Sequence, residues 1–362
     1  MNINHGREAK KIALVISTMQ AGGGERVVAT LSKEFAKHHD VTIIIFDDNR
    51  IDYEYGGKLL CIDCPDKLGT IAKVKNLLIR ARKLRLLYDS EQFDYIFGFM
   101  ESANYPSVLA SRKTIASLHI DPAFLSPIER FLLKQIYPWA RQVAPVSEDI
   151  ASLLRGKYRL KNVSTIYNPV PVNELKQLAD RQRPQDRQYI LAVGRLTYQK
   201  HFDLLIDAYN ISRAKHDCDL IILGEGELRD ELEAQVSKLG LEEKVKMPGR
   251  LNDPFHYFKH AEFMALSSRA EGFPMVLIEA LTLSCPVLSV DCPTGPREII
   301  RHRENGLLIE MENQSLLTGS IDELFYDETF RKKLSDNAAE SVAHLSAENI
   351  CQQWFKVADI QQ

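Results

Sequence analysis

Short apolar runs alternate with longer amphipathic stretches along the first half of the chain. Residues 24–37, for example, have the spacing of a helix and stand between two apolar runs of strand length. Strands that alternate with helices indicate parallel βαβ units, whose sheet is covered by helices on both faces. Strands are therefore predicted at residues 11–18, 40–47, 93–99, 113–119 and 142–147.

The second half of the chain repeats this alternation after an interruption. Prolines and charges dominate residues 171–188, which are predicted to be a linker. Helical spacing follows at residues 201–215 and 227–240. Strands are predicted at residues 189–193, 219–223, 244–247, 262–266, 286–290 and 306–310.

These two similar halves predict an α/β protein with two domains, residues 1–170 and residues 189–343. Each domain is expected to be a Rossmann-like, doubly wound parallel sheet, and the two sheets are expected to face a central cleft. Ligands of such sheets bind beyond the carboxyl ends of the strands. The loops that follow the strands are therefore where a site is expected.

Composition narrows the class of protein. With 362 residues and 45% hydrophobic content the chain can bury two cores, and a net charge of -3 makes nucleic acid an unexpected partner. The six cysteines lack the spacing of a secreted framework, and no apolar run approaches the ~20 residues of a membrane span. A cytoplasmic chain with reduced thiols is expected, and the lone C-x-x-C of Cys61 and Cys64 leaves a redox or zinc role as an alternative.

A glycine-rich loop follows the first predicted strand. Gly22, Gly23 and Gly24 precede a helix, where glycines permit close approach and free N–H groups favour a phosphate. A nicotinamide-dependent dehydrogenase, with Asp47 on the ribose, is one alternative. The third glycine of its G-x-G-x-x-G pattern is replaced by Val27, and a plain tight turn remains the other alternative.

The loops after the later strands carry more chemistry. Arg195 and Lys200 follow the strand at 189–193, and Gly249 and Arg250 follow the strand at 244–247. Cations and glycines that meet at one edge of a sheet are suited to a diphosphate. The sequence therefore predicts an anion site in the second domain.

The stretch SRAEGFPMVLIEAL, residues 268–281, places two glutamates around the start of a predicted helix. Pro274 suits the first helical position, which leaves the N–H groups of Met275 and Val276 for a pyrophosphate. Glu271 precedes the helix and can reach hydroxyl groups in the cleft. Glu279 lies four residues after Met275 on the same helical face, although both glutamates could instead be ordinary solvent-facing residues.

The segments GRLTYQK, GEGELRDELE and SRAEGFPMVLIEALTLSCPVLSVDCPTGPREIIRHRENGLLI resemble the family 4 retaining glycosyltransferases of the GT-B fold. The signature of that family is a glutamate, seven residues and a second glutamate, as in Glu271 and Glu279. AGGGERVV and IYNPV resemble other segments of the same family. The resemblance implies a GT-B protein of the kind that builds bacterial lipopolysaccharide and surface glycans, with a final helix at 344–362 that packs back toward the first domain.

The resemblance also implies roles for single residues. Arg195 and Lys200 would hold the donor diphosphate, Glu271 the sugar hydroxyls and Glu279 the ribose. His119 would line the reacting face of the donor sugar, although a histidine of the core is the alternative. Further donor-binding positions would be Gly23, Gly24, Gly249, Arg250, Phe273, Pro274, Met275 and Val276.

The expected reaction moves a hexose or N-acetylhexosamine from a nucleotide diphosphate sugar to an acceptor hydroxyl, with retention. No metal and no cofactor are expected, and the D-x-D of Asp217 and Asp219 is interpreted as a turn because it precedes its strand. A UDP-sugar is favoured as donor. A GDP-mannose-dependent mannosyltransferase and a non-catalytic sugar-nucleotide-binding subunit are the alternatives.

The acceptor is expected to be lipid-linked or part of a lipopolysaccharide, O-antigen or capsule. Residues 67–87 contain basic but no acidic residues, with apolar positions at helical spacing. Such a helix suits an anionic membrane surface, and a solvated helix face is the alternative. The protein is thus expected in the cytoplasm, with peripheral attachment to the cytoplasmic face of the inner membrane.

Overall fold

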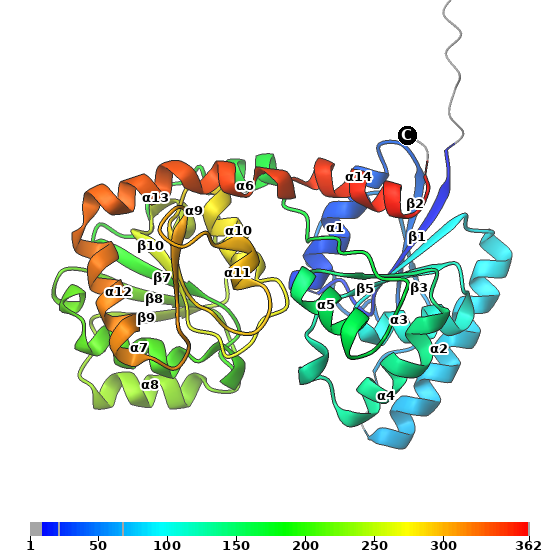
Figure 1. Ribbon diagram of the computed structural model, residues 1–362, viewed down its shortest axis with the longest axis horizontal. Helices are drawn as coiled ribbons and strands as arrows, with labels where there is room; N and C mark the ends of the chain where they lie inside the picture. Colours follow the sequence, from blue (N-terminus) through cyan, green and yellow to red (C-terminus); the bar gives the residue numbers. More distant parts are fainter. Residues whose placement is uncertain (1–8, 21, 67–68, 361–362) are drawn as a thin grey trace, which may run out of the picture. The chain divides into compact units, whose positions relative to one another are not determined.

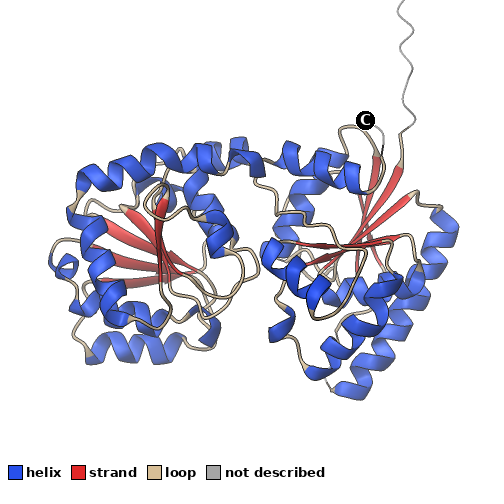
Figure 2. Cartoon of the chain, in the orientation of Figure 1, coloured by secondary structure: helices blue, strands red, loops and turns tan. Residues whose placement is uncertain are grey.

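The computed structural model describes residues 9–20, 22–66 and 69–360, and the chain divides into two compact units. The first unit runs to Val170 and takes up the chain again from Ala347. The second unit is Pro171–Ser346. Each unit has a sheet covered by helices, as Figures 1 and 2 show.

The sheet of the first unit has six parallel strands in the order β3-β2-β1-β4-β5-β6. From β1 the chain proceeds to β2 on one side and later to β4 on the other, so the switch point of this sheet lies between β1 and β4. The strands are β1 Lys11–Val15, β2 Asp40–Ile45, β3 Lys58–Cys61, β4 Tyr95–Phe99, β5 Thr114–Leu118 and β6 Gln142–Pro145.

Strand β3 is absent from the strands predicted above. It has only four residues and lies at the edge of the sheet, where its side chains are mostly exposed. An edge strand of this kind has no run of buried apolar positions to reveal it.

The longest helix described in the first unit is α2, and no side-chain hydrogen bond of the described residues caps its N-terminus. No helix in the described part of the chain is long and apolar enough to cross a bilayer. The helical elements are α1 Gly23–Phe35, α2 Thr70–Glu91, α3 Glu101–Ala110, η1 Pro122–Phe124, α4 Pro127–Ile136, η2 Tyr137–Trp139, α5 Glu148–Gly156 and α14 Ala347–Val357.

The C-terminal helix α14 packs on the first unit through aromatic rings. Phe355 lies with its ring centre 4.9 Å from that of Phe35, and Trp354 contacts both Phe97 and Phe99, at 5.4 and 5.6 Å. Since successive strand residues alternate between faces, Phe97 and Phe99 present one face of β4 to this helix. The last helix therefore completes the core of the first unit.

The sheet of the second unit also has six parallel strands, in the order β12-β11-β10-β7-β8-β9. Its switch point lies between β7 and β10, because the chain continues from β7 to β8 on one side and returns to β10 on the other. The strands are β7 Tyr189–Val193, β8 Asp219–Leu223, β9 Val245–Gly249, β10 Phe263–Leu266, β11 Val287–Val290 and β12 Gly306–Ile309.

The stretch 171–188 contains a helix, α6 Val172–Ala179, which belongs to the second unit. Its Leu175 and Ala179 are buried, and the helix packs against α9 Phe255–His260. The other helical elements of this unit are η3 Tyr198–Lys200, α7 Phe202–Ile211, η4 Arg213–His216, α8 Arg229–Lys238, α10 Met275–Thr282, α11 Pro296–Ile299, α12 Gln314–Tyr326, α13 Glu328–Ser341 and η5 Ala343–Leu345.

Candidate active site

A cation and a carboxylate meet at the switch point of the second sheet. Lys200 Nζ donates a hydrogen bond to Glu271 Oε1 at 2.6 Å. Lys200 ends η3, which follows β7, and Glu271 lies in the loop after β10. The side chains are only 15% and 8% exposed, so water screens their attraction weakly.

Hydroxyl groups fix both partners of this ion pair. Ser268 Oγ donates to Glu271 Oε1 at 2.6 Å, and Thr294 Oγ1 donates to the carbonyl oxygen of Glu271. Ser267 Oγ donates to the carbonyl oxygen of Lys200 at 2.9 Å. The sequence interpretation missed these three residues, although Ser268 stands in the same short stretch as Glu271, three positions before it.

Thr294 and Gly295 form a strained turn over the start of α10. Their φ angles are +62° and +91°, and a positive φ is uncommon for a β-branched residue such as threonine. A Cβ atom on Gly295 would lie 2.7 Å from Pro274 Cδ and 2.9 Å from the carbonyl oxygen of Gly272. Only glycine permits this close approach, so the turn and the helix start form one rigid corner.

Helix α10 begins at Met275, not at Pro274 as the sequence predicted. Pro274 has an extended ψ of 103° and occupies the N-cap position, while its carbonyl oxygen accepts a hydrogen bond from Leu277 N–H at 3.1 Å. Met275 and Val276 are therefore the first two helical residues, whose N–H groups have no partner four residues back. Unpaired N–H groups at the start of a helix suit an anion.

The remaining donor-binding positions of α10 are largely enclosed. Phe273 and Met275 are buried, and Val276 is half-buried. Glu279 lies one helical turn after Met275 and is also buried. Neither Glu279 nor Glu271 is therefore the solvent-facing glutamate of the alternative interpretation.

Arg195, unlike Lys200, has no ion-pair partner among the described residues. It lies exposed in the loop after β7, and its guanidinium makes no ion pair or hydrogen bond with any residue that the structure describes. The loop after β8 touches this loop, since a Cβ atom on Gly224 would lie 1.8 Å from the carbonyl oxygen of Gly194. Gly249 accepts a hydrogen bond from Gly224 N–H at 3.0 Å, which brings the end of β9 to the same edge.

Arg250 is exposed directly after β9. Near it, Arg229 forms two hydrogen bonds to Glu225, at 2.8 and 2.7 Å. The paired guanidinium lowers the pKa of the Glu225 carboxyl. The edge of the second sheet thus carries Arg195, Lys200, Gly249, Arg250, Glu271 and the start of α10.

In the first unit, Gly23 and Gly24 begin α1 at the switch point of the sheet. A Cβ atom on Gly24 would lie 2.7 Å from Met100 Sδ, which brings the loops after β1 and β4 together. Ser17 Oγ, from the loop after β1, and Ser102 Oγ, from the first turn of α3, lie 2.6 Å apart. The glycine loop therefore stands where a doubly wound sheet binds its ligand.

His119 follows β5 at this edge and is half-buried. Its Nε2 lies 3.0 Å from Ser117 Oγ, and its ring centre is 6.2 Å from that of Phe99. Burial lowers the pKa of His119 from 6.5 to about 4. The imidazole is therefore neutral near pH 7, and Phe99 connects it to Trp354 of α14.

Glu101 is a titratable residue that the sequence interpretation missed. It opens α3 directly after β4, and its Oε1 is buried with no hydrogen-bond partner among the described residues. Burial raises the pKa of its carboxyl from 4.5 to about 7. The sequence did offer one signal for Glu101: it is an acidic residue at the start of the helix that follows β4, where the helix dipole favours a negative charge.

The D-x-D pair lies at the amino edge of the second sheet, away from these loops. Asp219 begins β8 and forms ion pairs with Arg187 at 2.8 Å and Lys246 at 2.9 Å. Asp217 accepts a hydrogen bond from Tyr326 Oη at 2.6 Å. Both carboxylates thus form ion pairs or hydrogen bonds with neighbouring side chains.

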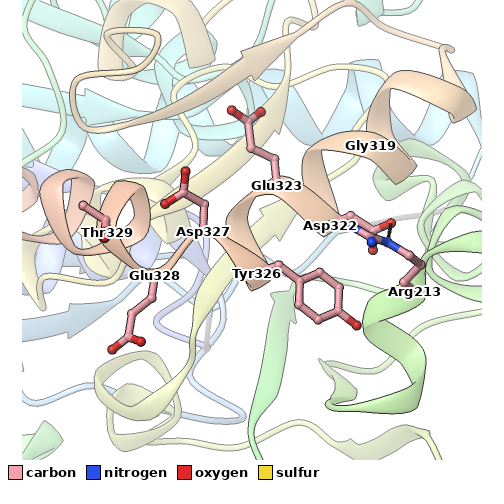
Figure 3. A pocket seen from close by; sticks show the side chains of 8 residues that line it. All are labelled: Arg213, Gly319, Asp322, Glu323, Tyr326, Asp327, Glu328 and Thr329. Carbon is pink, nitrogen blue, oxygen red and sulfur yellow. Dashed lines mark hydrogen bonds and ion pairs between the residues drawn. The ribbon is translucent and has the colours of Figure 1, made fainter.

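Tyr326 also borders a hollow at the amino edge, where η4 leads into β8. Figure 3 shows Arg213 directed toward Asp322, and their Nε and Oδ2 atoms lie 3.4 Å apart. This hollow is separated from the candidate site by the length of the strands. It is lined by Arg213, Gly319, Asp322, Glu323, Tyr326, Asp327, Glu328 and Thr329.

The C-x-x-C cysteines show no sign of activation. Cys64 is buried and its Sγ donates to Asn76 Oδ1 at 3.1 Å, while burial raises the pKa of Cys61. Reactive thiols instead have lowered pKa values. Within residues 9–20, 22–66 and 69–360, no three or more His, Cys, Asp and Glu side chains are grouped so as to hold a metal ion.

Two doubly wound parallel sheets in one chain, the second with a cation–carboxylate pair at its switch point, define a glycosyltransferase of the GT-B class. The chain belongs to the family 4 glycosyltransferases. The family model described as Glycosyltransferase Family 4 matches residues 21–174, and the one described as Glycosyl transferases group 1 matches residues 173–341. The dehydrogenase alternative is thereby set aside.

Relatives of known function resemble the chain along most of its length. It is 32% identical over 346 residues to a Campylobacter jejuni enzyme, the N-acetylgalactosamine-N,N'-diacetylbacillosaminyl-diphospho-undecaprenol 4-alpha-N-acetylgalactosaminyltransferase. The match covers 91% of this chain and 94% of the relative. It is 29% identical to the amylovoran biosynthesis glycosyltransferase AmsD of Erwinia amylovora, over 95% and 98% of the two chains.

A solved structure confirms the fold. The Anabaena protein Alr3699/HepE in complex with UDP and glucose superposes with a TM-score of 0.80 and covers 97% of this chain and 100% of its own. Because the two sequences are only 19% identical, this likeness speaks for the architecture alone.

Proposed function

We propose that this chain is a retaining, metal-independent glycosyltransferase that moves a hexose or N-acetylhexosamine from a UDP-sugar to a lipid-linked or surface-polysaccharide acceptor. The observation that carries the proposal is the Lys200–Glu271 pair beside the start of α10. UDP in the Anabaena structure and the N-acetylgalactosaminyl group named for the Campylobacter enzyme support the choice of donor.

Two cations of the second unit bind the donor diphosphate in this proposal, and only one of them is already paired with a carboxylate of a described residue. Lys200 is paired with Glu271, whereas Arg195 brings to the same edge a guanidinium that has no partner among the described residues. The N–H groups of Met275 and Val276 add the positive end of a helix dipole. These donors stabilise the negative charge that develops on the departing diphosphate.

Two carboxylates hold hydroxyl groups of the donor in this proposal. Glu271 keeps one oxygen in the ion pair with Lys200 and offers the other to the sugar, and Glu279 takes the ribose. A carboxylate locked beside an ammonium is a poor nucleophile, so no covalent intermediate is required. Phe273 and Met275 exclude water beside the same helix start.

The chemical step breaks the bond between the anomeric carbon and the diphosphate oxygen and forms a bond from that carbon to the acceptor oxygen, on the same face. The acceptor proton passes to the departing phosphate oxygen. A neutral His119, fixed by Ser117, contacts the reacting face of the sugar. It donates or accepts a hydrogen bond there without adding charge.

The acceptor side includes the basic helix α2, and we place the protein at the cytoplasmic face of a membrane. Lys73, Lys75 and Arg82 are exposed. Arg80 instead turns inward, 2.9 Å from Asp66, and Lys67 lies outside the described residues. An anionic lipid surface is the partner that suits the exposed cations.

A donor panel tests the proposal. Purified protein is incubated with UDP-N-acetylgalactosamine, UDP-N-acetylglucosamine, UDP-glucose and GDP-mannose, with a diphospho-undecaprenol-linked oligosaccharide as acceptor and with EDTA present. Transfer from a UDP-sugar, with the anomeric configuration of the donor kept in the NMR spectrum of the product, is expected. Transfer from GDP-mannose alone, an inverted product, or loss of activity that Mg²⁺ restores would each contradict a part of it.

A further inference from the structure

The segment from η1 to η2 carries apolar side chains on a face that none of the described residues covers. Phe124, Ile128, Phe131 and Trp139 are each 45–62% exposed. Ile128 and Phe131 lie three residues apart on one face of α4, and Phe124 in η1 and Trp139 in η2 flank that helix. We call these four residues the α4 stripe. On the opposite side, Leu133 and Ile136 are buried.

A helix that is apolar on two sides is expected between two apolar layers. On its buried side α4 packs against α3 and the core of the first unit. The outer layer is missing from the part of the chain that the structure describes. Single exposed apolar residues are ordinary, but a row of large ones marks an interaction surface.

Helix α2 carries a second row of exposed apolar side chains. Its Val74, Leu78 and Leu86 are 44–63% exposed and lie four or eight residues apart on one side of the helix. Both α2 and α4 pack against α3 in the same unit. More than half of the exposed large apolar side chains of the described residues belong to these two segments.

Most of the charges beside these apolar residues are positive, although Asp89 is exposed three residues after Leu86 and Glu129 stands next to Ile128. Lys75 and Arg82 alternate with Val74, Leu78 and Leu86 on the exposed side of α2, and Lys134 is exposed on α4. Arg112 lies over the ring of Trp139, 5.4 Å from its centre. A second copy of the same surface would bring these cations together, which disfavours self-association.

We propose that the α4 stripe inserts into the interfacial layer of an anionic bilayer. Phe124, Ile128 and Phe131 enter the boundary of the acyl chains, and Trp139 lies at the depth of the headgroups, where its indole N–H can find a polar partner. The cations of α2 meet the anionic headgroups. The inference rests on the proposed function, which already gives an anionic lipid surface as the partner of α2, and it adds the apolar residues that enter that surface.

The position of the stripe in the chain gives it a functional sense. Only two residues separate His119 from the start of η1 at Pro122. A bilayer that meets Phe124 therefore lies close to the edge of the sheet that carries His119. An acceptor sugar attached to a membrane lipid would be presented to that edge.

Vesicle binding of the full chain tests the proposal. We compare the native protein with the double variant Ile128→Ser/Phe131→Ser in co-sedimentation with phosphatidylcholine vesicles that contain phosphatidylglycerol. The loss of two large apolar contacts is expected to weaken binding about tenfold or more, and to leave a residual binding that salt abolishes. The matched control is Ile211→Ser, an equally exposed apolar residue of the second unit, which should bind like the native protein.

Fluorescence gives an independent measurement, because the chain has only two tryptophans and Trp354 is buried. The emission of Trp139 should shift to shorter wavelength on vesicles and be quenched by brominated lipid, and Trp139→Phe should remove both effects. Unchanged vesicle binding of the double variant, or an equal loss in Ile211→Ser, would overturn the proposal. So would a protein dimer that the double variant dissociates.

Activity separates this proposal from the proposed function. The double variant should transfer sugar normally to a short water-soluble acceptor, while transfer to an acceptor in vesicles falls with vesicle binding. Absence of all transfer by the native protein, with normal vesicle binding, would refute the reaction and leave the lipid surface standing. A double variant that loses both assays equally would refute the lipid surface.

Discussion

The ammonium of Lys200 lies 2.6 Å from Oε1 of Glu271, and both side chains are mostly buried. Replacement of one partner leaves the other charge in a poorly solvated site. Lys200→Ala should therefore lower the free energy of unfolding by about 3 kcal/mol and turnover by two orders of magnitude or more. Urea unfolding and initial rates measure the two effects.

A double variant serves as the control for that prediction. Lys200→Met/Glu271→Gln removes both charges together, so it should regain most of the lost stability while remaining inactive. If Lys200→Ala alone unfolds like the native protein, the ion pair does not contribute to stability.

Arg195 should show the opposite balance. Its guanidinium has no partner among the described residues, so Arg195→Ala should change the free energy of unfolding by no more than about 0.5 kcal/mol. Turnover should nonetheless fall by roughly two to three orders of magnitude, because an uncompensated cation is lost at the diphosphate. Near-normal turnover of this variant would end its assignment to the donor site.

The corner made by Gly295 and Pro274 predicts a loss of both stability and donor affinity. Gly295→Ala adds a Cβ atom 2.7 Å from Pro274 Cδ and displaces the start of α10. The matched control is Gly240→Ala, because Gly240 also has a positive φ, +65°, but has open space around it. The control should cost about 1 kcal/mol, and Gly295→Ala about 1–3 kcal/mol more, with a raised KM for the donor.

His119 and Glu101 should tilt the pH dependence of stability in opposite directions. The pKa of His119 is lowered from 6.5 to about 4, so the unfolded chain binds the proton first and stability falls as the pH drops through that range. The pKa of Glu101 is raised from 4.5 to about 7, so stability falls as the pH rises through that range.

Single variants separate these two effects between pH 4.5 and 6.5, where they oppose each other. Relative to the native profile, His119→Asn should make the free energy of unfolding decline more with rising pH, and Glu101→Gln should make it increase more. Urea unfolding at a series of pH values gives the profiles. Three parallel profiles would show that neither pKa is displaced.

Trp354 should affect His119 through Phe99, which contacts both rings, at 5.6 and 6.2 Å. Trp354→Leu loosens Phe99 and admits water, so the pKa of His119 should rise toward 6.5. NMR titration of the imidazole protons measures it. Phe355→Leu is the control, because Phe355 contacts Phe35 and His39 instead and should leave His119 unchanged.

The sequence was sufficient for most of the architecture, because the strands other than β3 and β9 are short runs of mostly buried apolar side chains. It was also sufficient to expect Lys200 and Glu271 in the loops that follow two strands. It did not show that they contact one another, since that depends on β7 and β10 being neighbours across a gap of many residues. Contacts set by strand order leave no local pattern to read.

Residues that depend on backbone conformation were harder still. Thr294 acts through a positive φ that its β-branched type disfavours, so its identity argues against the conformation that it adopts. Pro274 suits both the N-cap and the first helical position, and only its ψ decides between them. Helix α6 was hidden by the prolines that flank it.

The placement of α14 has a consequence for the order in which the protein forms. All six strands of the first unit have been synthesised by Pro145. Trp354, which contacts Phe97 and Phe99, is synthesised only after the whole second unit. The growing chain must therefore carry an uncovered aromatic surface on the ribosome while it builds another sheet. A stop codon just after Ser346 would spare every residue of the second unit and still leave the first unit unfinished.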